Sequence, residues 1–175
     1  MLYLITGEKG SGLLRQSAEL IKTLGHNRLM VVSTIKGIDD HLKEVFESRN
    51  LNPEIYQVSE EYFEMRLNVK DLKTLKKLIK RIVNEIILNM RDLKVKMAVI
   101  YRTNDLTPVL TGYDREIIVE EFWRMFTADL RITGDDFILI YEKLDESEKD
   151  PVCLFVDVEI KITSKDRSPI VLREY

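Results

Sequence analysis

The fold of this chain is constrained most by the alternation of short, continuous apolar runs with longer amphipathic stretches. Continuous apolar runs are typical of strands that are covered on both faces of a sheet. We expect such strands at 2–6 (LYLIT), 29–33 (LMVVS), 54–58 (EIYQV), 97–101 (MAVIY) and 137–141 (FILIY). Apolar residues recur at helical spacing between them, at 13–24, 38–48, 71–90 and 116–131. Strands that alternate with helices favour right-handed crossovers. The sequence therefore predicts a three-layer α/β/α fold with a mainly parallel sheet.

The C-terminal segment departs from this alternation. Residues 152–162 (VCLFVDVEIKI) and 169–175 (PIVLREY) flank the turn-rich segment TSKDRS, which predicts an antiparallel hairpin. A length of 175 residues suits one folded unit with a sizeable core, and no linker or internal repeat divides the chain. We therefore expect a single domain over residues 1–175.

Composition and charge argue against several classes of protein. The net charge of −3 gives no overall attraction to nucleic acid or to an anionic membrane. No apolar run is long enough to span a bilayer and no signal peptide is recognisable, which predicts a cytoplasmic protein. The one cysteine, Cys153, excludes an internal disulfide, and neither His26 nor His41 has a second ligand nearby, so no metal is expected. The richness in Glu and Lys is compatible with a thermophilic source.

The segment GEKGSGLL, residues 7–14, has the Gly-x-x-x-x-Gly spacing of a phosphate-binding loop between a predicted strand and a predicted helix. Such a loop continues with Lys and then Ser or Thr, but here Leu13 and Leu14 follow. Backbone N–H groups and a helix N-terminus can still bind phosphate or nucleotide weakly. The candidate residues for that binding are Gly7, Lys9, Gly10, Ser11, Gly12 and Arg15. The alternative is a purely structural turn, in which the glycines permit the bend and the leucines pack inward.

The order of these elements resembles the core of the RecA/KaiC-like P-loop ATPases, including archaeal paralogues of the recombinase RadA. LYLITGEKGSG resembles the family's first strand and phosphate loop, and RLMVVSTIKGIDDHLKEVFESRNLN its second strand and helix. VKMAVIYRTNDLTPVL resembles the strand that normally ends in the magnesium-binding aspartate. The resemblance covers nearly the whole chain and implies a RecA-like core closed by antiparallel strands.

The residues that the resemblance assigns to catalysis are missing. The lysine that contacts the terminal phosphates and the hydroxyl that ligates magnesium are both replaced by leucine. The carboxylate expected after the second strand is absent from residues 34–36 (TIK), and the metal-binding aspartate would fall at Tyr101 or Arg102, a few residues before Asp105. This pattern predicts a degenerate Walker A loop, no catalytic residues and no cofactor. The resemblance then implies a pseudo-ATPase that acts through a protein partner, through self-association, or on an active RecA-like paralogue in recombination or repair.

Two alternatives to that function stay open. One is a weak nucleotide sensor or unorthodox ATPase that uses Lys9 and Arg15 for phosphate and Asp105 for metal. The other is a nucleic-acid accessory protein, because a basic helix face can contact phosphate backbones. Its candidate residues are Lys73, Lys77 and Lys80, although such lysines also serve simply as a solvated helix surface.

Overall fold

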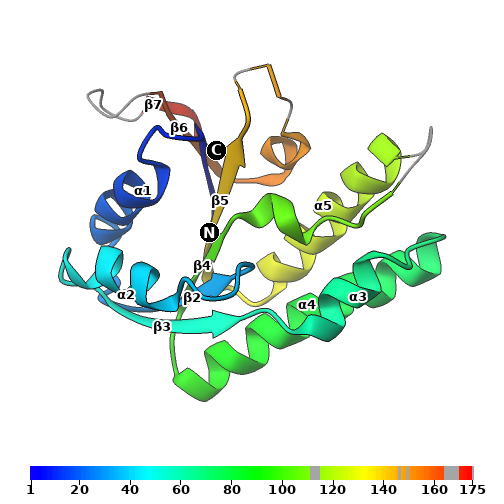
Figure 1. The fold of residues 1–175 in the computed structure, drawn as a ribbon, viewed down its shortest axis with the longest axis horizontal. Coiled ribbons are helices and arrows are strands. Elements are labelled where there is room, and N and C mark those ends of the chain that lie inside the picture. The colour runs from blue at the N-terminus through cyan, green and yellow to red at the C-terminus, as the bar shows by residue number, and fades with distance from the viewer. Residues whose placement is uncertain (111–114, 146, 149, 164–169, 175) are drawn as a thin grey trace.

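The computed structural model describes residues 1–110, 115–145, 147–148, 150–163 and 170–174, and its centre is a seven-stranded sheet in the order β3-β2-β4-β5-β1-β6-β7 (Figure 1). The strands are β1 (Leu2–Glu8), β2 (Arg28–Ser33), β3 (Asn52–Gln57), β4 (Met97–Tyr101), β5 (Asp136–Lys143), β6 (Val158–Ile162) and β7 (Ile170–Glu174). All neighbouring strands pair parallel except β6 and β7, which pair antiparallel. The predicted α/β fold class is therefore confirmed.

The approach to β6 differs from the sequence prediction. Residues 152–162 were expected to be extended throughout, but Pro151–Phe155 form a 3-10 helix, η2, before β6 begins. Pro151 stands in the first turn of η2, where its fixed backbone dihedral favours a helical start. The predicted turn TSKDRS, at 163–168, lies almost entirely outside the described residues.

Helices cover both faces of the sheet, as Figure 1 shows. They are α1 (Leu13–Lys22), α2 (Asp39–Glu47), α3 (Glu60–Arg66), α4 (Leu72–Leu93) and α5 (Arg115–Ile132), with a short 3-10 helix, η1 (Thr103–Leu106), after β4. Alternate strand residues divide the core into two clusters. Ile5 and Val31 pack with α1 and α2, whereas Leu4 and Met30 pack with α3, α4 and α5. This alternation produces the three layers, because successive side chains of a strand point to opposite faces.

The long helix α4 was the most strongly patterned segment of the sequence. It begins at a capping box in which Asp71 and Thr74 bond each other's backbone N–H groups, and it ends at Lys94 in a left-handed conformation. Its apolar stripe is buried against the sheet and α5, through Leu75, Leu78, Ile79, Ile82, Val83, Ile86 and Met90. None of the helices within the described residues combines the length and the apolar character needed to cross a lipid bilayer.

Helix α3 was not predicted from the sequence, and hydrogen bonds to the carboxylate of Glu85 explain how the start of this short helix is fixed. Glu85 of α4 accepts hydrogen bonds from the Tyr56 hydroxyl at 2.9 Å, from the Ser59 hydroxyl, and from Arg81 Nε at 2.9 Å. Ser59 is also the N-cap of α3 and accepts from the Tyr62 N–H. A tertiary contact with α4 therefore fixes the start of a helix of only seven residues, which would be unstable alone.

Candidate functional site: a glycine loop closed by leucine

The glycine loop joins β1 to α1 at the carboxyl edge of the sheet. Gly10 (φ 85°) and Gly12 (φ 76°) are left-handed, a conformation that favours glycine. Two backbone N–H groups of the loop are already bonded within the protein: the Lys9 N–H donates to the carbonyl of Lys143 in β5 and the Ser11 N–H to the Glu8 carbonyl, both at 3.1 Å. Gly12 is the N-cap of α1 and provides no side-chain cap. The loop thus retains the shape of a strand-to-helix turn with an open helix N-terminus.

The two leucines after the loop belong to the protein core. Leu13 is 5% exposed and Leu14 is 8% exposed, and both pack in the cluster between α1, α2 and the sheet. A methyl group added at Gly7 would lie 3.0 Å from Leu13 Cδ1 and 3.3 Å from the Ile162 carbonyl oxygen. The Ser11 Oγ would also lie 3.0 Å away, so Leu13 and Ser11 together leave little room for a side chain at Gly7. This geometry supports the structural interpretation of the loop glycines.

An open cleft of about 500 Å³ lies beside the loop. The loop, α1, α2 and the ends of β4 and β5 line it, through Glu8, Gly10, Gly12, Leu13, Leu14, Arg15, Gln16, His41, Tyr101 and Glu142. Of the candidate cations, Arg15 lines the cleft, whereas the exposed Lys9 is not among its lining residues. Two carboxylates, Glu8 and Glu142, oppose the single arginine.

The pKa of the Tyr101 hydroxyl reports the electrostatic environment of the cleft. Burial raises the pKa of the Tyr101 hydroxyl, and the nearby negative charge of Glu142 raises it further, against the smaller opposing effect of Arg102. The negative charge of Glu142 that disfavours a phenolate also disfavours the negative charge of a polyphosphate beside it. No pattern in the sequence indicated that Glu142 belongs to this site, because this residue reaches the loop only through the pairing of β5 with β1.

Asp105 lies at the ends of β2 and β4 but is engaged by other side chains. Its Oδ2 lies 3.1 Å from Arg102 Nε and accepts a hydrogen bond from the Thr34 hydroxyl at 3.1 Å. Asp105 does not line the cleft beside the glycine loop. The residues present therefore do not fit a magnesium–triphosphate group, since positions 13 and 14 offer neither a cation nor an oxygen ligand, and Asp105, the aspartate suggested for the metal, is paired with Arg102.

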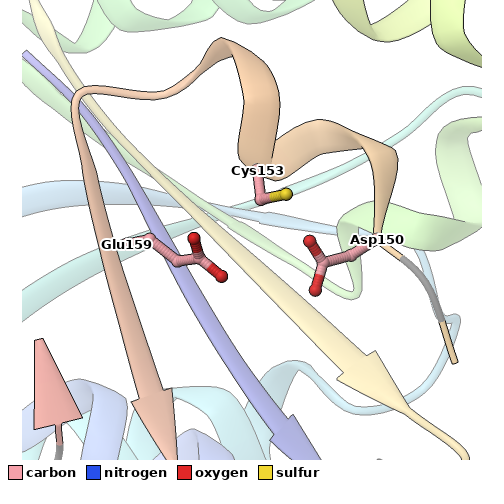
Figure 2. A group of neighbouring side chains, drawn as sticks. All are labelled: Asp150, Cys153 and Glu159. Atoms are coloured by element: carbon pink, nitrogen blue, oxygen red, sulfur yellow. The ribbon is translucent and has the colours of Figure 1, made fainter. Parts of the chain in front are cut away.

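Three potential metal ligands meet elsewhere in the structure, around η2 (Figure 2). The ligand atoms of Asp150, Cys153 and Glu159 lie within 4.8 Å of one another, and their side chains point toward a common space. The Asp150 carboxylate is already paired with Lys143 Nζ at 2.7 Å, and both side chains are largely buried. A cation would have to displace this ammonium group. The sequence had grouped none of these residues, because the link between η2 and β6 brings them together.

The lysines singled out for nucleic acid lie far from the loop in the layered architecture. Lys73, Lys77 and Lys80 are exposed on α4, which covers the face of the sheet opposite α1 and α2. The structure therefore separates two candidate sites that the sequence could not place relative to each other.

Comparisons with known proteins bear on the fold. Neither the scan against protein-family models nor the search of curated proteins gave a match. Among solved structures, a KaiC-like protein from the hyperthermophilic archaeon Pyrococcus horikoshii OT3 superposes with a TM-score of 0.63 at 14% identity, over 99% of this chain and 79% of that one. The RadB recombinase superposes with a TM-score of 0.53 at 15% identity, over 99% of this chain and 81% of that one. At these identities the similarity shows the fold alone.

Proposed function

Since the chain has the RecA-like α/β fold, we propose that it is a version of this fold that does not hydrolyse ATP and that acts by binding a protein partner. The observation that carries the proposal is the burial of Leu13 and Leu14 in the core at the two positions where hydrolysis needs a lysine and a hydroxyl. Neither leucine can bind phosphate or metal by rotating its side chain.

The size of the loss supports this proposal. Phosphoryl transfer depends almost entirely on positioning and on electrostatic stabilisation of the transferring group. Removing one such stabilising group commonly costs ~3–4 kcal/mol, or roughly 100- to 1000-fold in rate. Here several groups are replaced at once, and Glu8 and Glu142 add negative charge to the cleft. Losses within one constellation do not add simply, but together they leave no basis for turnover.

A partner-binding role then rests on what the fold retains. Without hydrolysis, the conserved architecture can serve as a surface for a RecA-like paralogue or for a second copy of this chain. Two exposed apolar residues on neighbouring segments are candidates for such a surface: Leu67 is 65% and Val109 49% exposed, and the Val109 N–H donates to the carbonyl of Arg66, the residue before Leu67. Exposed apolar groups that lie together favour protein contacts.

Hydrolysis is tested by incubating the purified protein with ATP and magnesium and measuring phosphate release. We expect release no faster than in the buffer blank. The matched variants are Lys9→Ala, Arg15→Ala and Asp105→Asn, which each remove one of the three groups proposed for unorthodox chemistry. Turnover that any of these variants abolishes would contradict the proposal, whereas turnover that none of them changes indicates a contaminating enzyme.

Partner binding is tested separately by sedimentation over a range of protein concentrations, alone and with a purified RecA-like recombinase. We expect an association that Leu67→Asp weakens, because a buried carboxylate at an interface is costly. The control is Leu154→Asp, at an apolar side chain that is 56% exposed but lies on η2. A monomer that binds no recombinase would refute the partner role without affecting the result on hydrolysis.

A phosphate or nucleotide sensor is a second candidate, and two observations favour it. The α1 N-terminus has no side-chain cap, and the buried Ser11 hydroxyl beside it has no hydrogen-bond partner among the described residues. Arg15 adds one cation to the cleft. Calorimetry with ATP, ADP and their magnesium complexes at millimolar concentration tests this function. Heat that disappears in Arg15→Gln would support a sensor, and no heat together with no shift in melting temperature would eliminate it.

A further inference from the structure

One face of α4 carries positive charge only. We call this the basic face, and its members are Lys73, Lys76, Lys77, Lys80 and Arg91. All five side chains are exposed. Their spacing by three, four or eleven residues places them on one side of the helix, over a length of about 27 Å at the rise of an α-helix. The four lysines lie within about 10 Å along the helix axis and Arg91 follows about 16 Å further on, so the face is a cluster of lysines with one more cation beyond it.

The charge of the basic face is not balanced within the part of the chain that the structure describes. None of its five members forms an ion pair there. Arg81, at the border of the basic face, shows the contrast, because it bonds both Glu61 and Glu85 on the side toward α3. The carboxylates of α4 itself, Glu85 and Asp92, lie off the basic face.

This arrangement is unfavourable for the helix in isolation. Lys73 and Lys77, and likewise Lys76 and Lys80, are like charges four residues apart, which repel. Lys73 also stands in the first turn of α4, where the helix dipole opposes its charge, and the acidic group that interacts with it there is the N-cap carboxylate of Asp71. An anionic partner would relieve both effects at once.

A hollow of about 420 Å³ continues the basic face at the C-terminal end of α4. It is lined by Ile87, Met90, Arg91, Lys94, Val95, Lys96, Thr133 and Asp135. Its one carboxylate, Asp135, lies 3.8 Å from Lys96 Nζ, which leaves Arg91 and Lys94 without an ion pair among the described residues. The hollow thus combines an apolar wall with cations, and its volume is in the range of small-molecule sites.

We propose that the basic face binds the phosphate backbone of a single-stranded nucleic acid and that the hollow receives one of its bases. A lysine cluster of one sign is complementary to the negative charge of a phosphate backbone, and lysines contact phosphates without reading sequence. A base can enter the hollow only when it is unstacked, which selects a single strand. No aromatic residue lines the hollow, so binding is weak and independent of sequence.

The experiment measures the anisotropy of a fluorescein-labelled oligodeoxythymidine titrated with the whole chain at several salt concentrations. The test variant carries Lys73→Gln, Lys77→Gln and Lys80→Gln, which keep helix propensity. The control carries Lys22→Gln, Lys36→Gln and Lys43→Gln, which remove the same charge from exposed positions on α1, between β2 and α2, and on α2, away from α4. Circular dichroism checks that both variants remain folded.

For the unchanged chain we expect a slope of log K against log salt of about −3.5, as five cations predict for a single strand. The test variant should bind at least ~10-fold more weakly at low salt, and the size of its slope should fall by about 2. The control should bind like the unchanged chain. An abasic oligomer of equal length should bind more weakly, because it cannot fill the hollow.

Several results would overturn the inference. These are the absence of binding at low salt, equal losses in the test and control variants, and tighter binding of duplex than of single strand. Binding of polyglutamate without binding of the oligomer would identify an acidic protein as the partner instead. Equal affinity for the abasic oligomer would remove the hollow from the site.

Discussion

Truncating Leu13 or Leu14 to alanine separates a core role for these residues from a role as lining of a ligand site. Both side chains are almost fully buried. Each buried carbon contributes roughly 0.8 kcal/mol, so losing the three terminal carbons of a leucine costs about 2.4 kcal/mol before any cavity is counted. An empty cavity left by the truncation adds to this cost, so that Leu→Ala substitutions in a core lower the free energy of unfolding by about 2–5 kcal/mol.

The position of these leucines at the edge of the cleft narrows the expected range of the loss in the free energy of unfolding. Both also line the open cleft, so water can enter the space that truncation leaves and the cavity cost is reduced. We therefore expect each single variant to lower the free energy of unfolding by about 2–3 kcal/mol, which lowers the melting temperature by roughly 5–10 °C for a chain of this size. The double variant should not be additive, because the two residues are adjacent.

The assay is equilibrium unfolding in urea, with the free energy extrapolated to water. Arg15→Ala is the matched control, since it lies on the next position of α1 and is exposed, and its effect should stay within ~0.5 kcal/mol. If each leucine variant lowers the free energy of unfolding by less than ~1 kcal/mol, or by no more than Arg15→Ala does, then the leucine side chains do not hold the loop closed. The argument from their burial to a loss of hydrolysis would then fail.

Two further predictions concern polar groups in the core. Burial acts to raise the pKa of Glu85, but hydrogen bonds from Ser59 and Arg81 outweigh it and hold that pKa below its ordinary value of 4.5. The ionised carboxylate therefore stabilises the fold above that pH, and its contribution to the free energy of unfolding is lost as the pH falls further. Urea unfolding between about pH 3 and 7 should show this loss in the unchanged chain and not in Glu85→Gln. The second concerns the buried pair of Lys143 and Asp150: Lys143→Met should cost ~3–5 kcal/mol by leaving the carboxylate unpaired, and adding Asp150→Leu should recover most of it. A pH-independent difference for Glu85→Gln, or a double variant as unstable as Lys143→Met alone, would contradict these accounts.

Much of the fold was predictable because its strands and helices are encoded locally. The strands that are covered on both faces appear in the sequence as continuous apolar runs, and α4 appears as apolar residues at helical spacing. The order of the elements and the α/β class therefore followed from hydrophobic periodicity. Helix α3 and η2 were missed, because one is fixed by a hydrogen-bond network with Glu85 and the other begins at Pro151 inside an apolar run. Both depend on contacts or backbone restraints that hydrophobic periodicity does not report.

The sequence by itself determined which chemistry is missing at the glycine loop, since the identity of Leu13 and Leu14 is independent of conformation. Only the tertiary structure decided what replaces it. Leu13 closes over Gly7, Glu142 enters the cleft because β5 pairs with β1, and Asp150, Cys153 and Glu159 meet around an ion pair. The physical reason is that side-chain identity is local, whereas the neighbours of a residue are set by strand order and by packing between segments that are distant in the chain.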